Sequence, residues 1–438
     1  MKRLLFSSSF ALLAACSGAS ATGDAGLTFQ KDVRPIVEAK CQVCHVEGSF
    51  TPFALTTYQD VYTHRAAIAS AVGDGRMPPW PPSDSCGSYQ HDRSLSPEQR
   101  AAVVAWAGGL APEGEASTFV APDSGTPTAL RVDTSLAIPM PYQPVSSPDE
   151  YRCFVLDWPQ TTTKYVTGLR VVPGAIAEVH HAIIFQIAPA DVAAVQALDA
   201  ADPAEGYSCF GGSGVNAAGW VGAWVPGSTG NVFPADTGIA IAPGSKLVVQ
   251  VHYNTANTAP VPDQGAMGDT RVELQLADTV KTPAVVLKWA NPQWVRNHTM
   301  TIDAGDPDSV HAFEFTPGPF LGTLSGGVLP SNSAFQVWTA GLHMHARGAK
   351  ATLQVTHPDG SKDCLLQIDD WSFHWQGSYD LVKPVKVGAG DSLSIECHFD
   401  NSGNRQPIVN GIPAPVGPVN WGETTEDEMC LGIMYATP

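Results

Sequence analysis

Two histidines, His343 and His345, stand one residue apart at the end of the apolar stretch FQVWTAGLHMH. Successive side chains of a β-strand alternate between its faces, so these two imidazoles project from the same side. A pair of neutral imidazoles chelates a borderline or soft metal ion. A polar strand end that carries two histidines by chance is the alternative, and the pair alone does not decide between the two.

A second reactive group, Cys41, Cys44 and His45, forms the pattern C-x-x-C-H. In this pattern the two thiols attach haem as thioethers, and the adjacent histidine becomes an axial iron ligand. A redox dithiol and half of a zinc site are the alternatives. The sequence holds no second C-x-x-C, and the adjacent histidine is what haem attachment requires. The pattern therefore favours one covalently attached c-type haem.

Met77, in GDGRMPPW, is the expected sixth iron ligand, because a thioether opposite a histidine is the usual cytochrome c pairing. His64 and His91 are weaker candidates for that position, and a buried core methionine is the other interpretation of Met77. With its motifs CHVEGSF, RMPPW and LSPEQ, the segment 27–112 resembles a small class I cytochrome c.

A helix is predicted in SPEQRAAVVAWAGG, at the end of this segment. Ser96 is its N-cap, Pro97 takes the first turn, and Gln99 completes a capping box. Gly108 and Gly109 end the helix. Residues 113–129 follow, and their small and polar composition predicts a linker.

The first residues, MKRLLFSSSFALLAACSG, predict an export signal, because basic residues precede an apolar run too short to cross a membrane. Residues 1–16 end in LAAC, which resembles the lipobox of bacterial lipoproteins and implies lipidation of Cys16. Ordinary cleavage after a small residue is the alternative. We expect a protein of the bacterial cell envelope, periplasmic or surface-facing, anchored to the membrane at Cys16, where disulfides are permitted.

The rest of the chain has the composition of a turn-rich β protein: 15% charged residues, 41 Gly and 36 Pro. From about residue 130, strand-like runs such as SKLVVQVHYN and DSLSIECHFDN alternate with turn signals, which predicts antiparallel β-sandwiches. Only 188–206 is expected to hold a helix. The net charge of −18 argues against nucleic acid as a partner.

Further metal-ligand candidates lie in this β region. His180 and His181 are adjacent, so on a regular strand they point to opposite faces. Both reach one metal only if the strand bends or the rings use different nitrogens; one core and one surface histidine is the alternative. His252 lies on the polar face of SKLVVQVHYN, where a hydrogen-bonded core histidine is the plainer interpretation. Met429, before Cys430, is ordinarily a packing residue.

The fragments YRCFVLDW, VHHAIIFQ, QVHYN, LHMHARG, IECHF and DEMCLGIMY occur in this order. In this combination the region 130–438 resembles the copper type II, ascorbate-dependent monooxygenases, which include peptidylglycine α-hydroxylating monooxygenase and dopamine β-monooxygenase. The resemblance implies a multi-domain, mainly β protein. A small all-α cytochrome c domain would precede two antiparallel, jelly-roll-like β-sandwich copper domains, at 130–278 and 279–438.

The resemblance also implies two copper ions and their ligands. His180, His181 and His252 would bind the electron-transfer copper, and a second set would bind the catalytic copper: His343, His345 and Met429. A thioether favours Cu(I), which suits a metal that must be reduced before it meets dioxygen. Two disulfides are implied as well, Cys153–Cys209 and Cys397–Cys430, while Cys86 and Cys364 have no assigned partner.

The chain departs from the family at substrate-binding positions. An arginine that binds the substrate carboxylate in peptide-amidating members corresponds to Gly341, and an asparagine and a tyrosine correspond to Leu431 and Ile433. We therefore expect a small, uncharged organic substrate and not peptidylglycine. The implied reaction hydroxylates a C–H bond with dioxygen and consumes two electrons.

The fused haem is the second departure. Because a covalently linked carrier has a high effective concentration, the haem is expected to replace ascorbate and to pass electrons to the three-histidine copper. An external donor would then reduce the haem. A non-catalytic electron-transfer or copper-holding lipoprotein is one alternative, and an oxidase without organic substrate is the other.

Overall fold

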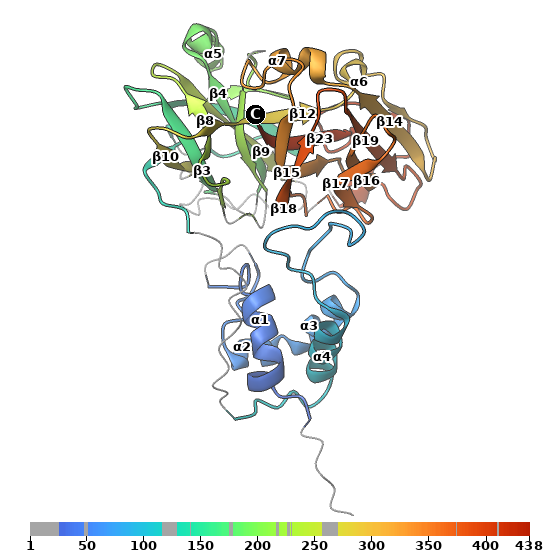
Figure 1. The fold of residues 1–438 in the computed structure, drawn as a ribbon. Helices are drawn as coiled ribbons and strands as arrows, with labels where there is room; N and C mark the ends of the chain where they lie inside the picture. The colour runs from blue at the N-terminus through green and yellow to red at the C-terminus, as the bar shows by residue number, and fades with distance from the viewer. Residues whose placement is uncertain are drawn as a thin grey trace, which may run out of the picture.

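A computed structural model of the chain describes residues 26–47, 51–115, 129–140, 142–174, 178–215, 219–225, 228, 230–255, 270–373, 375–409 and 411–438. The predicted export signal, Cys16 and most of the predicted linker lie outside these residues. A small helical part stands beside a larger β body (Figure 1). Among the described helices, none is long and apolar enough to cross a membrane.

The helical part consists of a short π-helix, Phe29–Val33, and four α-helices: α1 (Arg34–Lys40), α2 (Tyr58–Thr63), α3 (Arg65–Gly73) and α4 (Pro97–Gly108). The predicted capping box of α4 is present, since the Ser96 side chain accepts from the Gln99 amide and the Gln99 side chain accepts from the Ser96 amide. Val103 and Trp106 of α4 are buried in a core shared with the other helices. The predicted helix is thus confirmed.

The N-terminal half of the β body contains two sheets. The first has the order β5 (Tyr207–Ser208), β2 (Asp149–Asp157), β9 (Lys246–Asn254), β4 (Val179–Ile187), β6 (Gly219–Trp224). The second has the order β1 (Thr134–Ala137), β10 (Arg271–Ala277), β3 (Lys164–Val172), β8 (Thr237–Ile241), β11 (Thr282–Pro283), with β7 (Asn231–Val232) beside β3. One hydrophobic core joins both sheets. Strand β9 is buried on both faces, so its predicted polar face lies inside the protein.

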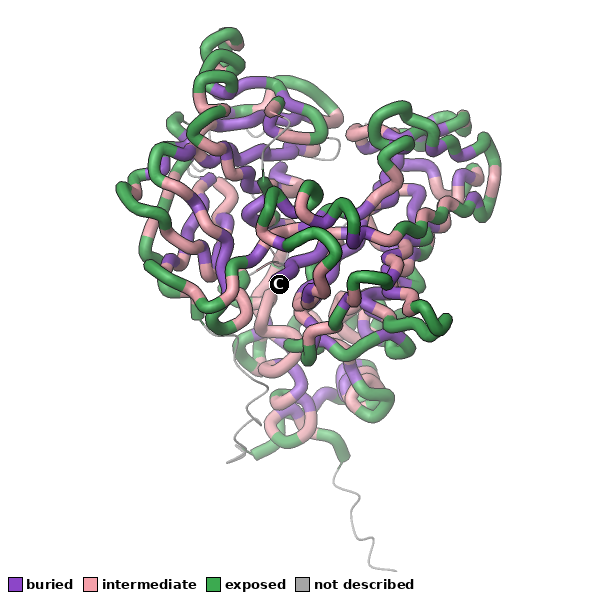
Figure 2. The backbone as a smooth tube through the Cα atoms, turned by 45° about the horizontal axis from the view of Figure 1, so that its top comes forward, coloured by how far each residue is buried: buried purple, intermediate pink, exposed green. Residues whose placement is uncertain are grey.

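The C-terminal half repeats this arrangement. One sheet has the order β12 (Val285–Trp289), β23 (Leu431–Thr437), β15 (Phe335–His343), β18 (Ser378–Val387). The other has the order β14 (Ser309–Phe315), β19 (Ser392–Phe399), β16 (Gly348–Thr356), β17 (Lys362–Ile368). Two short pairs accompany them: β13 (Thr301–Ile302) with β22 (Val419–Asn420), and β20 (Ile408–Val409) with β21 (Ile412–Pro413). The predicted mainly β architecture is confirmed, and buried segments run through each half (Figure 2).

The helix predicted within 188–206 is present as α5 (Val192–Ala201), after a 3₁₀ turn at Pro189–Asp191. The expectation that no other part of the body is helical was wrong. Short helices form at α6 (Pro292–Asn297) and α7 (Leu321–Leu324), the latter after a 3₁₀ turn at Gly318–Phe320. Each is too short to show a helical period, which needs a window of roughly 11 residues or more.

A segment of the helical part belongs structurally to the C-terminal half. Residues 80–90, here called the strap, lie between α3 and α4 in sequence and extend to β17 and β18 (Figure 1). The Ser83 amide donates to the Gln367 carbonyl (2.8 Å), and the Gln90 amide donates to the Asp380 carbonyl (2.7 Å). Tyr89 is buried in the hydrophobic core of the C-terminal half.

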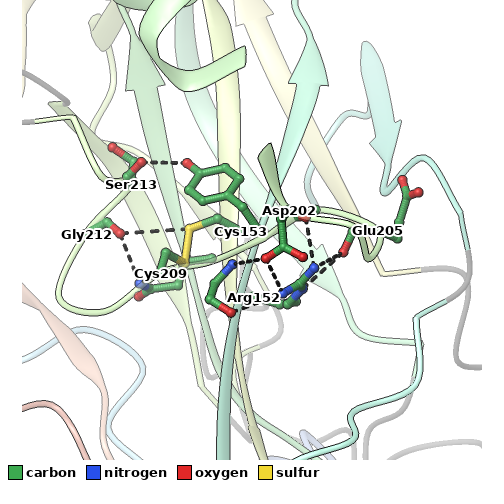
Figure 3. The surroundings of a disulfide bond; sticks show 11 residues. Arg152, Cys153, Asp202, Glu205, Cys209, Gly212 and Ser213 are labelled. Atoms are coloured by element: carbon green, nitrogen blue, oxygen red, sulfur yellow. Dashed lines mark hydrogen bonds and ion pairs between the residues drawn. A yellow bond between two sulfur atoms is a disulfide. The ribbon is translucent and has the colours of Figure 1, made fainter. Parts of the chain in front are cut away.

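Three disulfides join six cysteines of the described chain. Cys153–Cys209 and Cys397–Cys430 agree with the pairs that the family resemblance implies. Figure 3 shows the first beside Arg152, which donates to Asp202 (2.9 Å). The two cysteines that the sequence left unassigned form the third bond, Cys86–Cys364, and fasten the strap to β17.

Replacing Cys86 and Cys364 with serine should release the strap. Loss of a native disulfide typically costs about 2–5 kcal/mol, and here it removes a covalent link across 278 residues. We expect faster limited proteolysis within residues 80–90, mapped by mass spectrometry. The matched variant Cys153→Ser/Cys209→Ser should leave the strap protected. Equal cleavage of the strap in the wild type and both variants would show that the Cys86–Cys364 bond does not hold the strap in place.

Candidate metal centre

Three histidines meet at one end of two interior strands of the first sheet. Strands β4 and β9 are neighbours, and His181 lies opposite His252. The register shifts between Val179 and His181, so His180 is the extra residue of a β-bulge. Because a bulge re-aims a side chain, both adjacent histidines reach one place. The potential ligand atoms of His180, His181 and His252 all lie within 4.8 Å of one another.

A hydrogen bond selects the nitrogen that His252 offers, and the Nδ1 atoms of the three rings lie close together. His252 donates from Nε2 to Asp149 (2.8 Å), which leaves its Nδ1 facing His181 Nδ1 at 3.4 Å. His180 Nδ1 lies 3.4 Å from the same atom. The Tyr151 ring stacks on His252, with centroids 4.1 Å apart, and fixes its plane. The three rings therefore present Nδ1 to a common point, as ligands to one metal ion would.

His343 and His345 form a second set at the end of β15, with ring centroids 5.1 Å apart. His343 donates from Nδ1 to Gln376 Oε1 (2.5 Å), and His345 donates from Nδ1 to the Asp427 carbonyl (3.0 Å). Each ring thus keeps Nε2 for a metal. Bonds of this kind fix the tautomer and orientation of metal-binding histidines.

Met429 lies next to this second set. It precedes β23, in which Leu431 pairs with His343 of β15. The fully buried Glu428 carboxylate accepts from the backbone amides of His345 (2.8 Å) and Arg347 (2.6 Å). This carboxylate therefore joins the backbone of the H-x-H segment to the residue before Met429.

Burial also sets the charge of the imidazoles. It lowers the pKa of His343 to about 4 and that of His345 to about 3, and it holds the pKa of His181 well below its usual value. The three rings are therefore neutral near neutral pH, and a neutral imidazole is the form that binds a metal.

The two sets lie against each other. The ring centroids of His181 and His343 are 6.2 Å apart, and Phe373 stacks on His180 at 4.3 Å and lies 6.1 Å from His345. One small cavity is lined by residues from both halves: Tyr151, His180, His181, His252, His343, His345, Phe373 and Thr425.

Comparison with known proteins supports a copper centre. Residues 327–438 match the family described as copper type II ascorbate-dependent monooxygenase, C-terminal domain. The match includes all of the second set, His343, His345 and Met429.

A DBH-like monooxygenase protein 2 of Homo sapiens is 24% identical over 220 residues, which are 48% of this chain and 39% of the human protein. The chain thus spans about two fifths of that relative's length. Among solved structures, BuGH86wt with neoagarooctaose covers 65% of this chain and 32% of its own at 10% identity and TM-score 0.16. The infectious bursal disease virus Gx strain covers 68% of each chain at 10% identity and TM-score 0.17. Scores this low carry no argument.

The C-x-x-C-H residues lie at the end of α1. Cys41 and Cys44 are both free thiols, and burial raises the pKa of Cys41 to about 12. A redox dithiol needs a lowered thiol pKa, so this environment disfavours that alternative. His45 donates from Nδ1 to the Phe53 carbonyl (3.0 Å) and keeps Nε2 for a metal, as an axial haem ligand does.

The three candidates for the sixth haem ligand have different surroundings. Met77 packs against the core of the helical part, as does Cys41. His64 stacks on Phe53 at 3.9 Å, on the ring that also contacts His45. His91 directly follows the strap.

A larger cavity of about 1220 Å³ opens beside the second histidine set. Met429, Leu342, Leu431 and Ile433 line it near His343 and His345, and so do residues from the N-terminal half and the helical part, including Gln250, Cys44, Trp80 and Arg93. A Cβ added at Gly341 would lie 3.2 Å from Ser378 Oγ and 3.3 Å from the Gly377 carbonyl. Position 341, which the resemblance aligns with a substrate-binding arginine, therefore has little room for a larger side chain.

Several residues of the site were not identified from the sequence. Asp149 and Phe373 lie far from the histidines along the chain, and no local pattern marks them. Glu428 and Arg347 did carry a signal, because they stand inside the DEMCLGIMY and LHMHARG fragments.

Replacing Asp149 with alanine should weaken metal binding by the three-histidine set. The variant removes the acceptor that orients His252, and loss of such a partner typically costs about 10–100-fold in affinity. A competition titration with a copper chelator measures this. Asp157→Ala, which removes a largely exposed carboxylate at the other end of β2, should bind copper as the parent does; equal affinity in all three proteins would exclude this role for Asp149.

The metal-free protein should lose stability as the pH falls below about 6.5, because unfolded histidines take up protons that buried His343 and His345 do not. The loss approaches about 1.4 kcal/mol per pH unit for each such group and continues to the folded pKa values. Urea unfolding between about pH 7 and pH 5 measures it. His343→Gln should show a smaller slope, and an unchanged slope would argue against this origin.

Proposed function

We propose that the chain is a copper-dependent monooxygenase that hydroxylates a C–H bond of a small organic substrate with dioxygen. The observation that carries this proposal is the second histidine set with Met429, which lies within the family match and lines a large cavity. Metal-binding side chains at the wall of a cavity suit a metal that acts on a bound molecule.

The donor atoms suit copper at both sets. His180, His181 and His252 offer three nitrogens and would hold the electron-transfer copper. His343, His345 and Met429 would hold the catalytic copper, because a thioether favours Cu(I). When bound, copper supplies one-electron chemistry with dioxygen. The chain orients the ligands: Asp149 and Gln376 fix ring tautomers, and Glu428 holds the H-x-H backbone beside Met429.

The helical part would hold one c-type haem, attached at Cys41 and Cys44, with His45 and Met77 as axial ligands. The free thiols and the hydrogen bond of His45 support this assignment. Covalent fusion keeps this one-electron carrier close to the copper centre, where it would replace ascorbate and reduce the three-histidine copper. Cys44 and His181 line the same large cavity. An external donor would reduce the haem.

The substrate is proposed to be small and uncharged near the reacting carbon. Leu342, Leu431 and Ile433 make the cavity apolar beside the catalytic set, and Gly341 offers no charge to a carboxylate. A metal store needs no such cavity, which argues against the copper-holding alternative. We also propose that the protein acts at the bacterial cell envelope, lipid-anchored at Cys16.

The first test follows electrons from the haem to dioxygen. The copper-loaded protein with reduced haem is mixed with dioxygen, and haem oxidation is recorded in wild type, Met429→Ala and Met140→Ala. Wild type and Met140→Ala should react fast, because Met140 is an exposed methionine outside the site. Met429→Ala should react at least about tenfold more slowly, since the thioether that stabilises Cu(I) is lost.

Equal, slow haem oxidation in all three proteins would show that the haem does not supply an oxygen-activating copper. Fast oxidation in Met429→Ala would remove Met429 from the electron path.

A further inference from the structure

We propose that Lys288 binds a carboxylate of the substrate, and that the substrate is an apolar molecule with this charge at the end remote from the reacting carbon. This inference rests on the proposed function and deepens it, because it names the charged group of the substrate. It agrees with the apolar wall beside the second histidine set, since Lys288 lies farther along the cavity.

Lys288 lies in the same sheet as the second histidine set. It pairs with Ile433 of β23, and Ile433 pairs with Gly341 of β15 (Figure 1). Residues directly opposite each other in antiparallel strands project from one face, as do residues two apart in a strand. Lys288 therefore shares a face with Leu431 and His343, and each of these three residues lines the large cavity.

The spacing of the sheet sets the length of the ligand. Neighbouring strands are about 4.8 Å apart and successive residues about 3.4 Å, so the backbone of Lys288 lies about 12 Å from that of His343. Ile433 and Leu431 line the cavity between them. A molecule that reaches from Lys288 to the second set therefore needs several carbon atoms between its carboxylate and its other end, and these atoms would contact apolar side chains.

The Lys288 ammonium has no counter-charge in contact with it. It lies 5.4 Å from the centroid of the Trp220 ring, a cation–π distance, and no carboxylate of the described residues forms an ion pair with it. Lys288 is exposed to the cavity, yet the surrounding protein removes part of its hydration and lowers its pKa, while Glu423 raises it. A partly desolvated cation is stabilised by an anion that enters the cavity.

Glu423 is the acidic residue of the cavity wall nearby. Burial and the charge of Asp427 raise the pKa of its carboxyl group to about 7, although His298 and Lys288 lower it. Within the described chain, no group donates a hydrogen bond to this carboxyl. Near neutral pH it takes up a proton readily, and in its acid form it donates a hydrogen bond. An ammonium and a carboxylic acid together offer a carboxylate two donors.

Other cations line the cavity, but the sheet does not hold them beside the second set. Arg296 belongs to α6, and Arg93 belongs to the helical part, where its guanidinium lies over Trp80 at 5.5 Å. Among the described residues of the cavity wall, Lys288 is therefore the cation with a fixed place on the strands that carry His343.

The test measures binding without turnover. The full-length protein, with its cofactors bound and oxidised, is titrated by calorimetry with a series of phenylalkanoates of increasing chain length, and with the amide of each. We expect at least one carboxylate to bind about tenfold more tightly than its amide, because hydrogen bonds to charged groups are the stronger ones.

Lys288→Gln should abolish this preference, so that acid and amide bind equally. Lys288→Glu should invert it and favour the phenylalkylamine of the same length, a gain that a misfolded variant does not show. Arg296→Gln, which removes another cation of the cavity wall, should keep the preference for the carboxylate. Glu423→Gln should also keep it, because the side-chain amide still donates a hydrogen bond.

Equal binding of every acid and its amide in the wild type would overturn the inference and leave the proposed function standing. So would a preference that survives in Lys288→Gln, or one that is lost only in Arg296→Gln. A preference that depends on Lys288 supports the inference whether or not the bound compound is hydroxylated. Absence of hydroxylation when the reduced, copper-loaded protein meets dioxygen and the tightest-binding acid would count against the proposed function alone.

Discussion

One buried carboxylate connects the parts of the candidate metal centre. Asp149 accepts from His252 in its own half of the β body and from Thr425 in the other half. Burial raises the pKa of this carboxyl group, but the hydrogen bonds outweigh it and hold the pKa at about 2. A charged acceptor makes these bonds strong, and a charge at this depth is tolerated only because they are made. The orientation of one ligand and the docking of the two halves thus depend on the same group.

In the C-terminal half, too, a buried charged side chain is stabilised by several hydrogen bonds. Arg347 is buried and donates to Asn401, Gln406 and the Glu426 carbonyl, while its backbone amide donates to Glu428. Such a network is stable only when every polar group has a partner. The disulfide Cys397–Cys430 fixes the residue after Met429. The ligand segment is therefore held on both sides of Met429, by hydrogen bonds and by a covalent bond.

Local sequence patterns predicted several structural features of this protein. The features that they missed depend on contacts between residues that lie far apart in the chain. Ser96 and Gln99 predicted the helix that they cap, because a capping box needs only neighbouring residues. The spacing of His343 and His345 predicted a shared face. For His180 and His181, the sequence predicted a shared metal only if the strand bends. It could not predict the bulge at His180, since a register shift depends on the partner strand. The Asp149–Thr425 contact spans 276 residues, and no local pattern encodes it.

The strap has a consequence for how the molecule is made. Its residues are synthesised with the helical part, yet Cys364, Ile368 and Leu381, its partners, come about 280 residues later. At the usual rate of about 5–20 residues per second, a ribosome needs tens of seconds to reach them. Until then Cys86 and the apolar side of Tyr89 lack their native cover. A C-terminal half made without residues 80–90 would therefore lack Tyr89, a part of its own hydrophobic core.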